Sequence, residues 1–375
     1  MWSGYPRASS TRKRCYCVCG SPCSDSPGCR YAIWRIRQAF RQVIRRWRRR
    51  RQSRSTALSA PNSVPPSELH VGWHTGAERA SNPTEQRIIL KDGRTLGFAE
   101  YGDPGGEPVL EFHGVPGSRL EAWYYDDPGK KVGARIIGID RPGFGLSTYT
   151  KGYRIVDWPE DVLEFANALG LKRFAVAGVS SGSPYALACA RFIPERLRAC
   201  AIVSGISPLK VEGEQLNPRH YIMAPEIVVA RLANSVPFIA SLAFRYILSQ
   251  IRTDPAKAMK RLMKGAPPSD LELLNDKRAK RHFQQTVMEC SRGGLKGSID
   301  SVGLELKDWR FRLQDITTHV SIWQGEADNI VFPSAGRYMA SKLPKHTLHM
   351  IPNAGHLTVI ARHAESVLRE LVIST

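Results

Sequence analysis

Residues 174–190 read FAVAGVSSGSPYALACA, and this stretch decides the fold. It begins with a short apolar run that is typical of a buried strand and ends with an alanine- and leucine-rich run that favours a helix. Between them lies a G-x-S-x-G motif in which Gly178 and Gly182 flank Ser180. A sharp strand-to-helix turn of this kind lifts one hydroxyl out of a sheet, and it needs glycine where a Cβ would collide with neighbouring backbone. Ser180 is therefore the candidate nucleophile.

A serine hydroxyl is a weak nucleophile on its own, so the motif is informative only when a base and an acid follow it. Both follow here: Asp328 lies in the stretch GEADNIV at 325–331, and His356 comes later in the chain. Glu326 is the nearby rival for the acid, but the spacing Gly-x-x-Asp-x-x-Val favours Asp328. We expect His356 to take the proton of Ser180 while Asp328 orients the imidazole.

Short apolar runs alternate with helical patterns from residue 86 onward. Strands are expected at 87–91, 95–101, 109–112, 135–139, 174–179, 199–203, 320–323 and 347–351. Helices are expected at 157–169, 184–192, 333–343 and 357–372. Asp92-Gly93 predicts a two-residue hairpin turn between the first two strands. The alternation predicts a mostly parallel sheet covered by helices on both faces, opened by an antiparallel hairpin.

Four sequence blocks make residues 86–372 resemble the α/β-hydrolase fold, in the large cap-bearing branch that includes esterases, lipases and proline iminopeptidases. The blocks are HGVPGS at 113–118, DRPGFGLS at 140–147, the Ser180 motif, and the later aspartate and histidine. The order serine, aspartate, histidine is that of this family. The resemblance implies an α/β-hydrolase fold with a mostly parallel central sheet, helices on both faces and a helical cap inserted after the sixth strand. Such a cap excludes water and shapes the substrate pocket.

The resemblance also implies an oxyanion hole, in which fixed backbone N–H groups stabilise negative charge on a carbonyl oxygen. The expected donors are the N–H groups of Val115 and Ser181. His113 and Gly114 are expected to support the first loop, and Asp140 to shape the pocket floor through buried hydrogen bonds. The body of the sequence contains no visible metal-ligand set, and no cofactor is expected, since serine chemistry needs neither.

Differences in charge, cysteine and Ser/Pro content divide the chain into distinct regions. The expected parts are a basic, Cys-rich tail at 1–51, a Ser/Pro-rich linker at 52–85, a hydrolase core at 86–206 and 301–375, and a helical cap at 207–300. Residues 1–67 contain fifteen Lys or Arg and one acid, so they carry +14 of the formal net charge of +20. The body is therefore only mildly basic. Its three cysteines are typical of a reducing compartment, so an intracellular location is expected.

The tail contains a candidate amphipathic helix from Tyr31 to Arg51. Its apolar stripe consists of Ile33, Ile36, Phe40, Val43, Ile44 and Trp47, with arginines between them. This pattern predicts an interfacial helix on an anionic membrane surface, with acylation of the nearby cysteines as a second anchor. A cleaved mitochondrial transit peptide, a zinc site, plain disorder and an arginine patch for nucleic acid are the competing interpretations. Nucleic acid is not the expected partner.

The expected activity is hydrolysis of a carboxylic ester or related acyl substrate, small or lipid-like, through an acyl-enzyme. An aminopeptidase of the proline iminopeptidase type is the alternative, but that family's loop is closer to His-Gly-Gly-Pro-Gly, and Val115 stands here in place of the second glycine. A serine nucleophile argues against the epoxide hydrolases and haloalkane dehalogenases of this fold, which attack with aspartate. A non-catalytic ligand-binding protein is the third alternative, and the complete serine, aspartate and histidine set argues against it.

Overall fold

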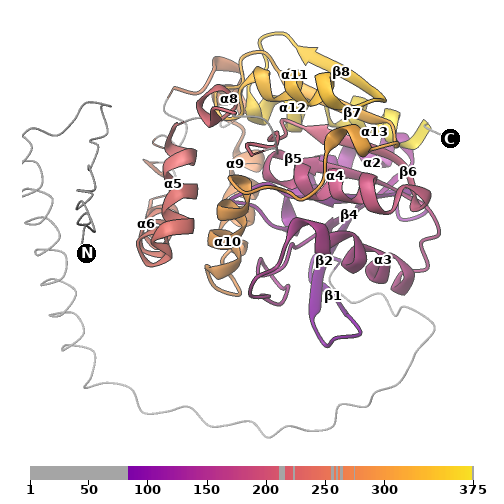
Figure 1. Ribbon diagram of the computed structural model, residues 1–375, viewed down its shortest axis with the longest axis horizontal. Helices are drawn as coiled ribbons and strands as arrows, with labels where there is room; N and C mark the ends of the chain where they lie inside the picture. The colour runs from indigo at the N-terminus through magenta and orange to yellow at the C-terminus, as the bar shows by residue number, and fades with distance from the viewer. Residues whose placement is uncertain are drawn as a thin grey trace, which may run out of the picture. The chain divides into compact units, whose positions relative to one another are not determined.

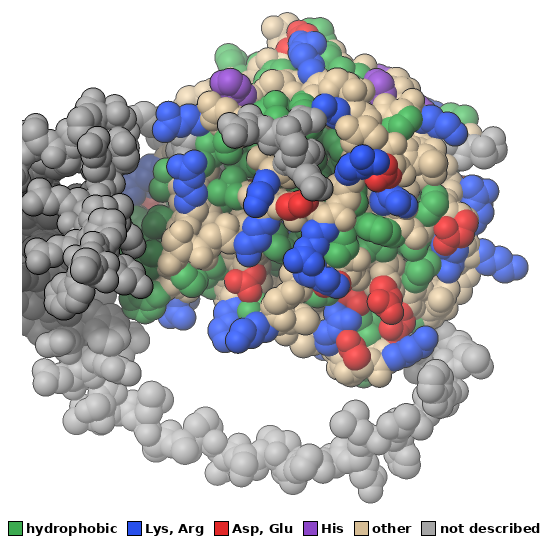
Figure 2. Space-filling view, in the orientation of Figure 1, with side chains coloured by type: hydrophobic (Ala, Val, Ile, Leu, Met, Phe, Trp, Pro, Cys, Tyr) green, Lys and Arg blue, Asp and Glu red, His purple; other side chains and the backbone are tan. Residues whose placement is uncertain are grey.

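The structure is a computed structural model that describes residues 83–210, 216–222, 224–254, 257–258, 261, 265–273 and 275–373. The predicted amphipathic helix and nearly all of the predicted linker lie outside the described residues, so both stay predictions. Within the described ranges, no helix is long and apolar enough to cross a membrane. Lys and Arg side chains lie beside Asp and Glu over much of the face shown in Figure 2, as the mildly basic charge of the body predicts.

Eight strands form one sheet in the order β1-β2-β4-β3-β5-β6-β7-β8 (Figure 1). They are β1 (Gln86–Ile89), β2 (Thr95–Gly102), β3 (Glu107–Phe112), β4 (Ala134–Ile139), β5 (Phe174–Val179), β6 (Leu197–Val203), β7 (Val320–Gly325) and β8 (His346–Ile351). The β1–β2 and β2–β4 pairs are antiparallel, and all other neighbouring strands are parallel. The predicted mostly parallel sheet with an opening hairpin is confirmed.

The hairpin turn itself differs from the prediction. The N–H of Leu90 donates to the carbonyl oxygen of Arg94 at 2.7 Å, so the loop has three residues instead of two. Gly93 closes this loop with a φ of 84°, the left-handed conformation that three-residue hairpin loops require at this point. The Asp92 side chain accepts the N–H of Arg94 at 2.9 Å, which stabilises the longer turn.

Helices cover both faces of the sheet, because successive side chains of a strand point to opposite sides. Along β5, Phe174 and Val176 pack into the core cluster that includes α3 (Trp158–Ala168), α4 (Ser183–Phe192) and α11 (Pro333–Lys342). The alternate residues of β5 pack into a second cluster with α12 (His356–Arg362) and α13 (Ala364–Ile373). The single helix expected at 357–372 is thus two helices, separated at His363. A further helix, α2 (Asp126–Val132), precedes β4.

A long helical segment separates β6 from β7 in the chain, and Figure 1 shows α5, α6, α9 and α10 grouped to one side of the sheet. Among the described residues, the helices of this segment are α5 (Ala224–Ser235), α6 (Pro237–Thr253), α8 (Pro268–Leu273), α9 (Lys277–Glu289) and α10 (Lys296–Glu305). The described part of the chain also contains short 3-10 helices at Arg119–Tyr125, Ile155–Asp157, Ser180–Gly182, Pro194–Arg196, Pro218–His220 and Leu313–Asp315. The expected end of the insertion at residue 300 lies inside α10, and the division into domains stays a prediction.

Candidate active site

Ser180 is the first residue after β5 and begins the short turn that leads into α4. Its φ is 50°, in the left-handed region that residues with a side chain rarely adopt. The flanking glycines are sterically required. A Cβ on Gly182 would collide with the carbonyl oxygen of Phe112, and one on Gly178 would lie 2.8 Å from the Cβ of Ala186. The sequence pattern and the observed turn therefore agree at each of these three positions.

The serines next to Ser180 are engaged elsewhere. The hydroxyl of Ser181 donates to Glu305 at 2.7 Å, and that of Ser183 donates to the carbonyl oxygen of Ile206 at 2.8 Å. No described side chain forms a hydrogen bond with the Ser180 hydroxyl. Among these three serines, Ser180 alone has a hydroxyl that is not committed to a structural hydrogen bond.

Asp328 lies in the loop after β7, and His356 is the first residue of α12. The Nδ1 atom of His356 is 2.8 Å from Oδ2 of Asp328, and both side chains are buried. The other carboxyl oxygen of Asp328 accepts the N–H groups of Ile330 and Val331 at 2.9 and 3.0 Å. The rival acid Glu326 instead lies 45% exposed near an arginine, so the structure brings Asp328 and not Glu326 to the imidazole.

The Asp328 contact determines the protonation of His356. With Nδ1–H donating to the carboxylate, Nε2 is left as the atom that can receive a proton. Burial alone would lower the pKa of His356, but the Asp328 carboxylate, with help from Asp270 and Glu121, raises it above its usual value. The structure contains no hydrogen bond between Ser180 and His356, and such contacts commonly tighten only when substrate binds. The complete triad therefore stays a prediction.

The loop after β3 passes directly over Ser180. A Cβ on Gly114 would lie 3.1 Å from the Cβ of Ser180. The N–H of Gly114 already donates to Oε1 of Glu121 at 3.0 Å, so it is not available to a substrate. The next N–H along the loop is that of Val115, which is the donor that the sequence predicts. The N–H of Ser181, on the other side of Ser180, remains the predicted second donor.

Hydrogen bonds from the buried side chains of His113 and Arg141 fix the position of this loop. The Nε2 atom of His113 accepts the backbone N–H of Arg141 at 3.2 Å, so its Nδ1 carries the proton and donates to the carbonyl oxygen of Gly114 at 2.7 Å. Burial, with the nearby Arg141 charge, lowers the pKa of His113 well below its usual value. The guanidinium of Arg141 donates to the carbonyl oxygens of Gly114 and Ser181, each at 3.1 Å. It also donates to the hydroxyl of Ser301 at 3.0 Å.

Asp140 lies in a buried network of its own. Its carboxylate accepts the backbone N–H of Arg119 at 2.7 Å, the Arg119 guanidinium at 2.8 Å and the N–H of Leu146 at 2.8 Å. Arg119 also pairs with Glu289 of α9 at 2.7 Å. These contacts join the loops after β3 and β4 to the helical segment, and the role of Asp140 at the pocket floor stays a prediction.

Two acids lie near the loop after β3: Glu111 is fully buried, and Glu121 is half-buried. Burial raises the pKa of Glu121 to about 7 and, together with the Glu121 charge, raises that of Glu111 well above its usual value. Neither carboxyl oxygen of Glu111 has a hydrogen-bond partner among the described side chains and backbone groups. Burial without a hydrogen-bond partner favours the neutral form of the Glu111 carboxyl group, because an unpaired buried carboxylate is costly.

Asp270 of α8 lies against the start of α12, the helix that begins at His356. Its carboxylate accepts the N–H of Leu357 at 3.3 Å and both the N–H and the hydroxyl of Thr358, at 2.8 and 2.6 Å. The position of His356 therefore depends on a residue of the helical segment.

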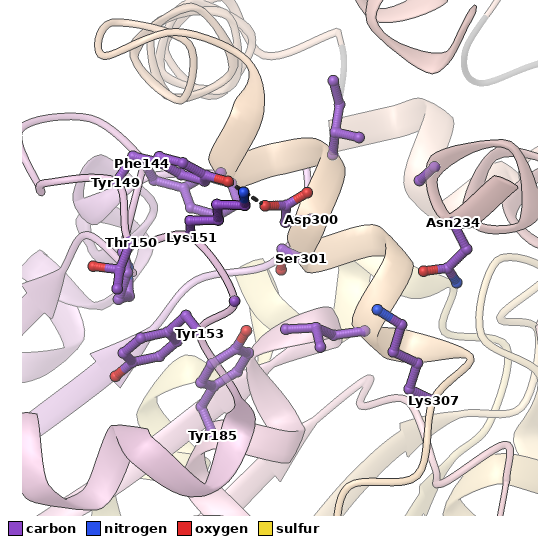
Figure 3. Close-up of a pocket in the computed structure, with 16 residues that line it drawn as sticks. Phe144, Tyr149, Thr150, Lys151, Tyr153, Tyr185, Asn234, Asp300, Ser301 and Lys307 are labelled. Carbon is purple, nitrogen blue, oxygen red and sulfur yellow. Dashed lines mark hydrogen bonds between the residues drawn. The ribbon is translucent and has the colours of Figure 1, made fainter. Parts of the chain in front are cut away.

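A cavity of about 320 Å³ lies between the loop after β4, α4 and the helices α5 and α10 (Figure 3). Its walls include the aromatic rings of Phe144, Tyr149, Tyr153 and Tyr185, and the Tyr149 hydroxyl donates to Asp300 at 2.7 Å. None of the predicted catalytic side chains lines this cavity.

The chain belongs to the α/β-hydrolase fold family, whose sequence profile matches residues 107–362. It is 23% identical over 333 residues to bifunctional epoxide hydrolase 2 of Sus scrofa, a match that covers 83% of this chain and 56% of that protein. It is 35% identical over 120 residues to the proline iminopeptidase of Xylella fastidiosa, covering 30% of this chain and 37% of the peptidase. An esterase structure from Exiguobacterium antarcticum superposes with a TM-score of 0.56 at 19% identity, covering 76% of this chain and 99% of that one.

These relatives and structural neighbours are hydrolases, and the fold and family expected from the sequence are confirmed. The chain spans little more than half the length of the pig relative. Sequence reasoning missed Glu121 and Asp270 altogether and gave Arg141 no role of its own beyond its place in the DRPGFGLS block. The DRPG block at 140–143 was the one sequence signal that pointed to Arg141. A buried arginine needs several hydrogen-bond acceptors, and only the fold shows which groups supply them.

Proposed function

We propose that this chain is a serine hydrolase that cleaves a carboxylic ester or a related acyl substrate through an acyl-enzyme. Ser180 is the nucleophile, His356 the general base and acid, and Asp328 the group that orients the imidazole. The N–H groups of Val115 and Ser181 form the oxyanion hole. The observation that carries the proposal is the left-handed serine between two sterically required glycines, in a chain whose buried Asp328–His356 pair leaves Nε2 free.

The proposed reaction uses the Ser180 hydroxyl, the Nε2 atom of His356 and two backbone N–H groups in turn. The Ser180 hydroxyl adds to the substrate carbonyl carbon as its proton passes to Nε2 of His356. The carbonyl oxygen becomes negative and accepts the two backbone N–H groups. The intermediate then collapses, the C–O bond to the leaving group breaks, and the leaving group takes the proton from Nε2. Water repeats the sequence on the acyl-enzyme, which releases the acid and restores Ser180.

Two other activities are suggested by the relatives. The 35% identity to a proline iminopeptidase over 120 residues supports an aminopeptidase as the second candidate. Val115 at the second glycine position of that family's loop weighs against it. The pig relative is named an epoxide hydrolase, but a serine at position 180 supports acyl transfer, because epoxide hydrolases of this fold attack with aspartate.

The test combines active-site labelling with a substrate panel. A fluorophosphonate probe is expected to label the wild-type protein at Ser180, as read by mass spectrometry of the modified peptide. Ser180→Ala is expected to lose the label and about 10⁴-fold or more of the turnover. The exposed Ser341→Ala variant is the matched control. Label on another serine, or wild-type turnover by Ser180→Ala, contradicts the proposal.

The panel consists of p-nitrophenyl esters of increasing chain length, a lysophospholipid and a proline p-nitroanilide. Turnover of the esters supports the leading proposal, and lysophospholipid turnover extends it to lipid-like substrates. Preference for the proline amide supports the peptidase instead. Binding without turnover of any substrate, together with an unlabelled Ser180, supports a non-catalytic ligand-binding protein.

A further inference from the structure

The carbonyl oxygen of Gly114 accepts two hydrogen bonds from buried side chains. One comes from Nδ1–H of His113 at 2.7 Å, and the other comes from Nη2 of Arg141 at 3.1 Å. His113 is fully buried and Arg141 is 1% exposed, so water does not compete for either contact. The same guanidinium reaches across to the carbonyl oxygen of Ser181 with Nη1, at 3.1 Å. One side chain therefore joins the two loops on either side of Ser180.

The acceptor on the first loop is part of the predicted oxyanion hole. The carbonyl group of Gly114 and the N–H group of Val115 belong to one planar peptide unit and point in opposite directions. Fixing the oxygen therefore fixes the direction of the N–H. A hydrogen bond to the oxygen also polarises the unit and strengthens its N–H as a donor. The contact to Ser181 acts differently. The Ser181 carbonyl belongs to the Ser181–Gly182 peptide unit, not to the unit that contains the Ser181 N–H, so Arg141 fixes the position of the turn and does not polarise this donor directly.

The charge of Arg141 is not used in an ion pair. Within the described part of the chain, no carboxylate lies within ion-pair distance of its guanidinium, which packs instead over the rings of Phe144 and Tyr185 at 4.9 and 4.7 Å. Burying an unpaired charge costs free energy. Charge-assisted hydrogen bonds to two carbonyl oxygens offset part of that cost. The remaining positive charge lies on the other side of the Gly114–Val115 peptide unit from the site where the reaction creates a negative charge.

We propose that Arg141 is a positioning residue of the oxyanion hole. It orients and polarises the Gly114–Val115 peptide unit, fixes its distance from the Ser181 turn, and stabilises the oxyanion through its charge. This inference rests on the proposed function, because it assumes that Ser180 attacks a carbonyl. Arg141 does not touch the substrate.

The inference predicts a specific kinetic signature. An interaction made only in the transition state lowers kcat and kcat/KM equally and leaves KM unchanged. Arg141→Met keeps most of the apolar volume but loses the charge and all donors. Its kcat is expected to fall about 10²–10³-fold, the usual effect of losing one oxyanion donor, with KM within about twofold of wild type. Arg141→Lys keeps the charge but not the fork, so we expect it to recover about tenfold of that loss.

The experiment measures kcat and KM on the best p-nitrophenyl ester, the rate of fluorophosphonate labelling at Ser180, and the melting temperature of each variant. Arg154→Met is the matched control, because Arg154 is exposed and pairs only with Asp157 on the surface. It is expected to match wild type in all three measurements.

The outcomes separate the two proposals. If wild-type protein is not labelled at Ser180, the proposed function is wrong and the Arg141 inference falls with it. If Ser180 is labelled but folded Arg141→Met keeps wild-type kcat, or loses only substrate affinity, the Arg141 inference alone is overturned. If Arg141→Met does not fold, Arg141→Lys decides: a kcat lowered about 10–100-fold at unchanged KM supports the need for the fork, and wild-type kcat overturns it.

Discussion

Replacement of Asp328 by asparagine is expected to lower kcat about 10⁴-fold, or about 5.4 kcal/mol in activation free energy. The structure dictates how the amide is oriented. The N–H groups of Ile330 and Val331 both donate to Oδ1, so the amide oxygen must stay there and the NH₂ must replace Oδ2. That position now faces Nδ1–H of His356 and the side-chain NH₂ of Gln324, which donate to Oδ2 at 2.8 and 3.1 Å.

In Asp328→Asn, the new NH₂ group faces two other donors, Nδ1–H of His356 and the NH₂ of Gln324, so the imidazole cannot keep its present hydrogen bond. His356 must move its proton to Nε2 or rotate, and either change removes the base from Ser180. The assay is steady-state hydrolysis of a p-nitrophenyl ester between pH 6 and 9, with circular dichroism to check folding. Glu326→Gln is the matched control, because its carboxyl lies at the surface, 3.8 Å from Arg337. We expect this control to retain wild-type kcat.

The reasoning is refuted by either of two results. The first is a folded Asp328→Asn protein with kcat within tenfold of wild type. The second is a large loss in Glu326→Gln, which would move the acid to the rival position.

Three further predictions follow from other parts of the chain. Because its pKa is raised and the base must be neutral, His356 is expected to give kcat/KM an acid limb with a midpoint above 6.5; a midpoint at or below that value contradicts the Asp328 interaction. Gly182→Ala is expected to lower the free energy of unfolding by about 3 kcal/mol or more in urea titrations, whereas Gly105→Ala, whose added Cβ would make only an ordinary contact with the Asp103 side chain at 3.6 Å, is expected to be nearly neutral. A protein that begins at Ala80 is expected to fold and hydrolyse a soluble ester, yet to lose the salt-sensitive co-sedimentation with anionic vesicles that we propose for Tyr31 to Arg51. Equal binding of both forms, or a native N-terminus found downstream of residue 54, argues against that membrane anchor.

The sequence predicted those features that depend on short stretches of chain. The strand, turn and helix around Ser180 are encoded within seventeen residues, and apolar runs located the other strands. The hairpin was wrong by one residue, because an Asp-Gly pair suits two- and three-residue loops alike and the Leu90–Arg94 hydrogen bond decides between them. The break at His363 was missed, because the apolar pattern continues through it.

Features that depend on distant contacts were not predictable in the same way. Asp270 is 88 residues from Thr358, and its sequence surroundings resemble any exposed helix start. Glu121 is an ordinary helical glutamate by pattern, and only the fold places it against the N–H of Gly114. The role proposed for Arg141 likewise requires knowing that two loops, each far along the chain from the other, present carbonyl oxygens to one guanidinium.

The attachment of α8 to α12 restricts how this molecule admits a substrate. Ser180 is only 9% exposed, so groups around it have to move before a bulky molecule can reach its hydroxyl. If α8 were the moving part, it would pull Asp270 away from the first turn of α12 and release His356 at the moment of binding. Substrate can therefore enter without disturbing the base only if α8 stays in contact with α12 while other groups move aside. The hydrogen bonds of Asp270 thus link access to the site with the placement of its base.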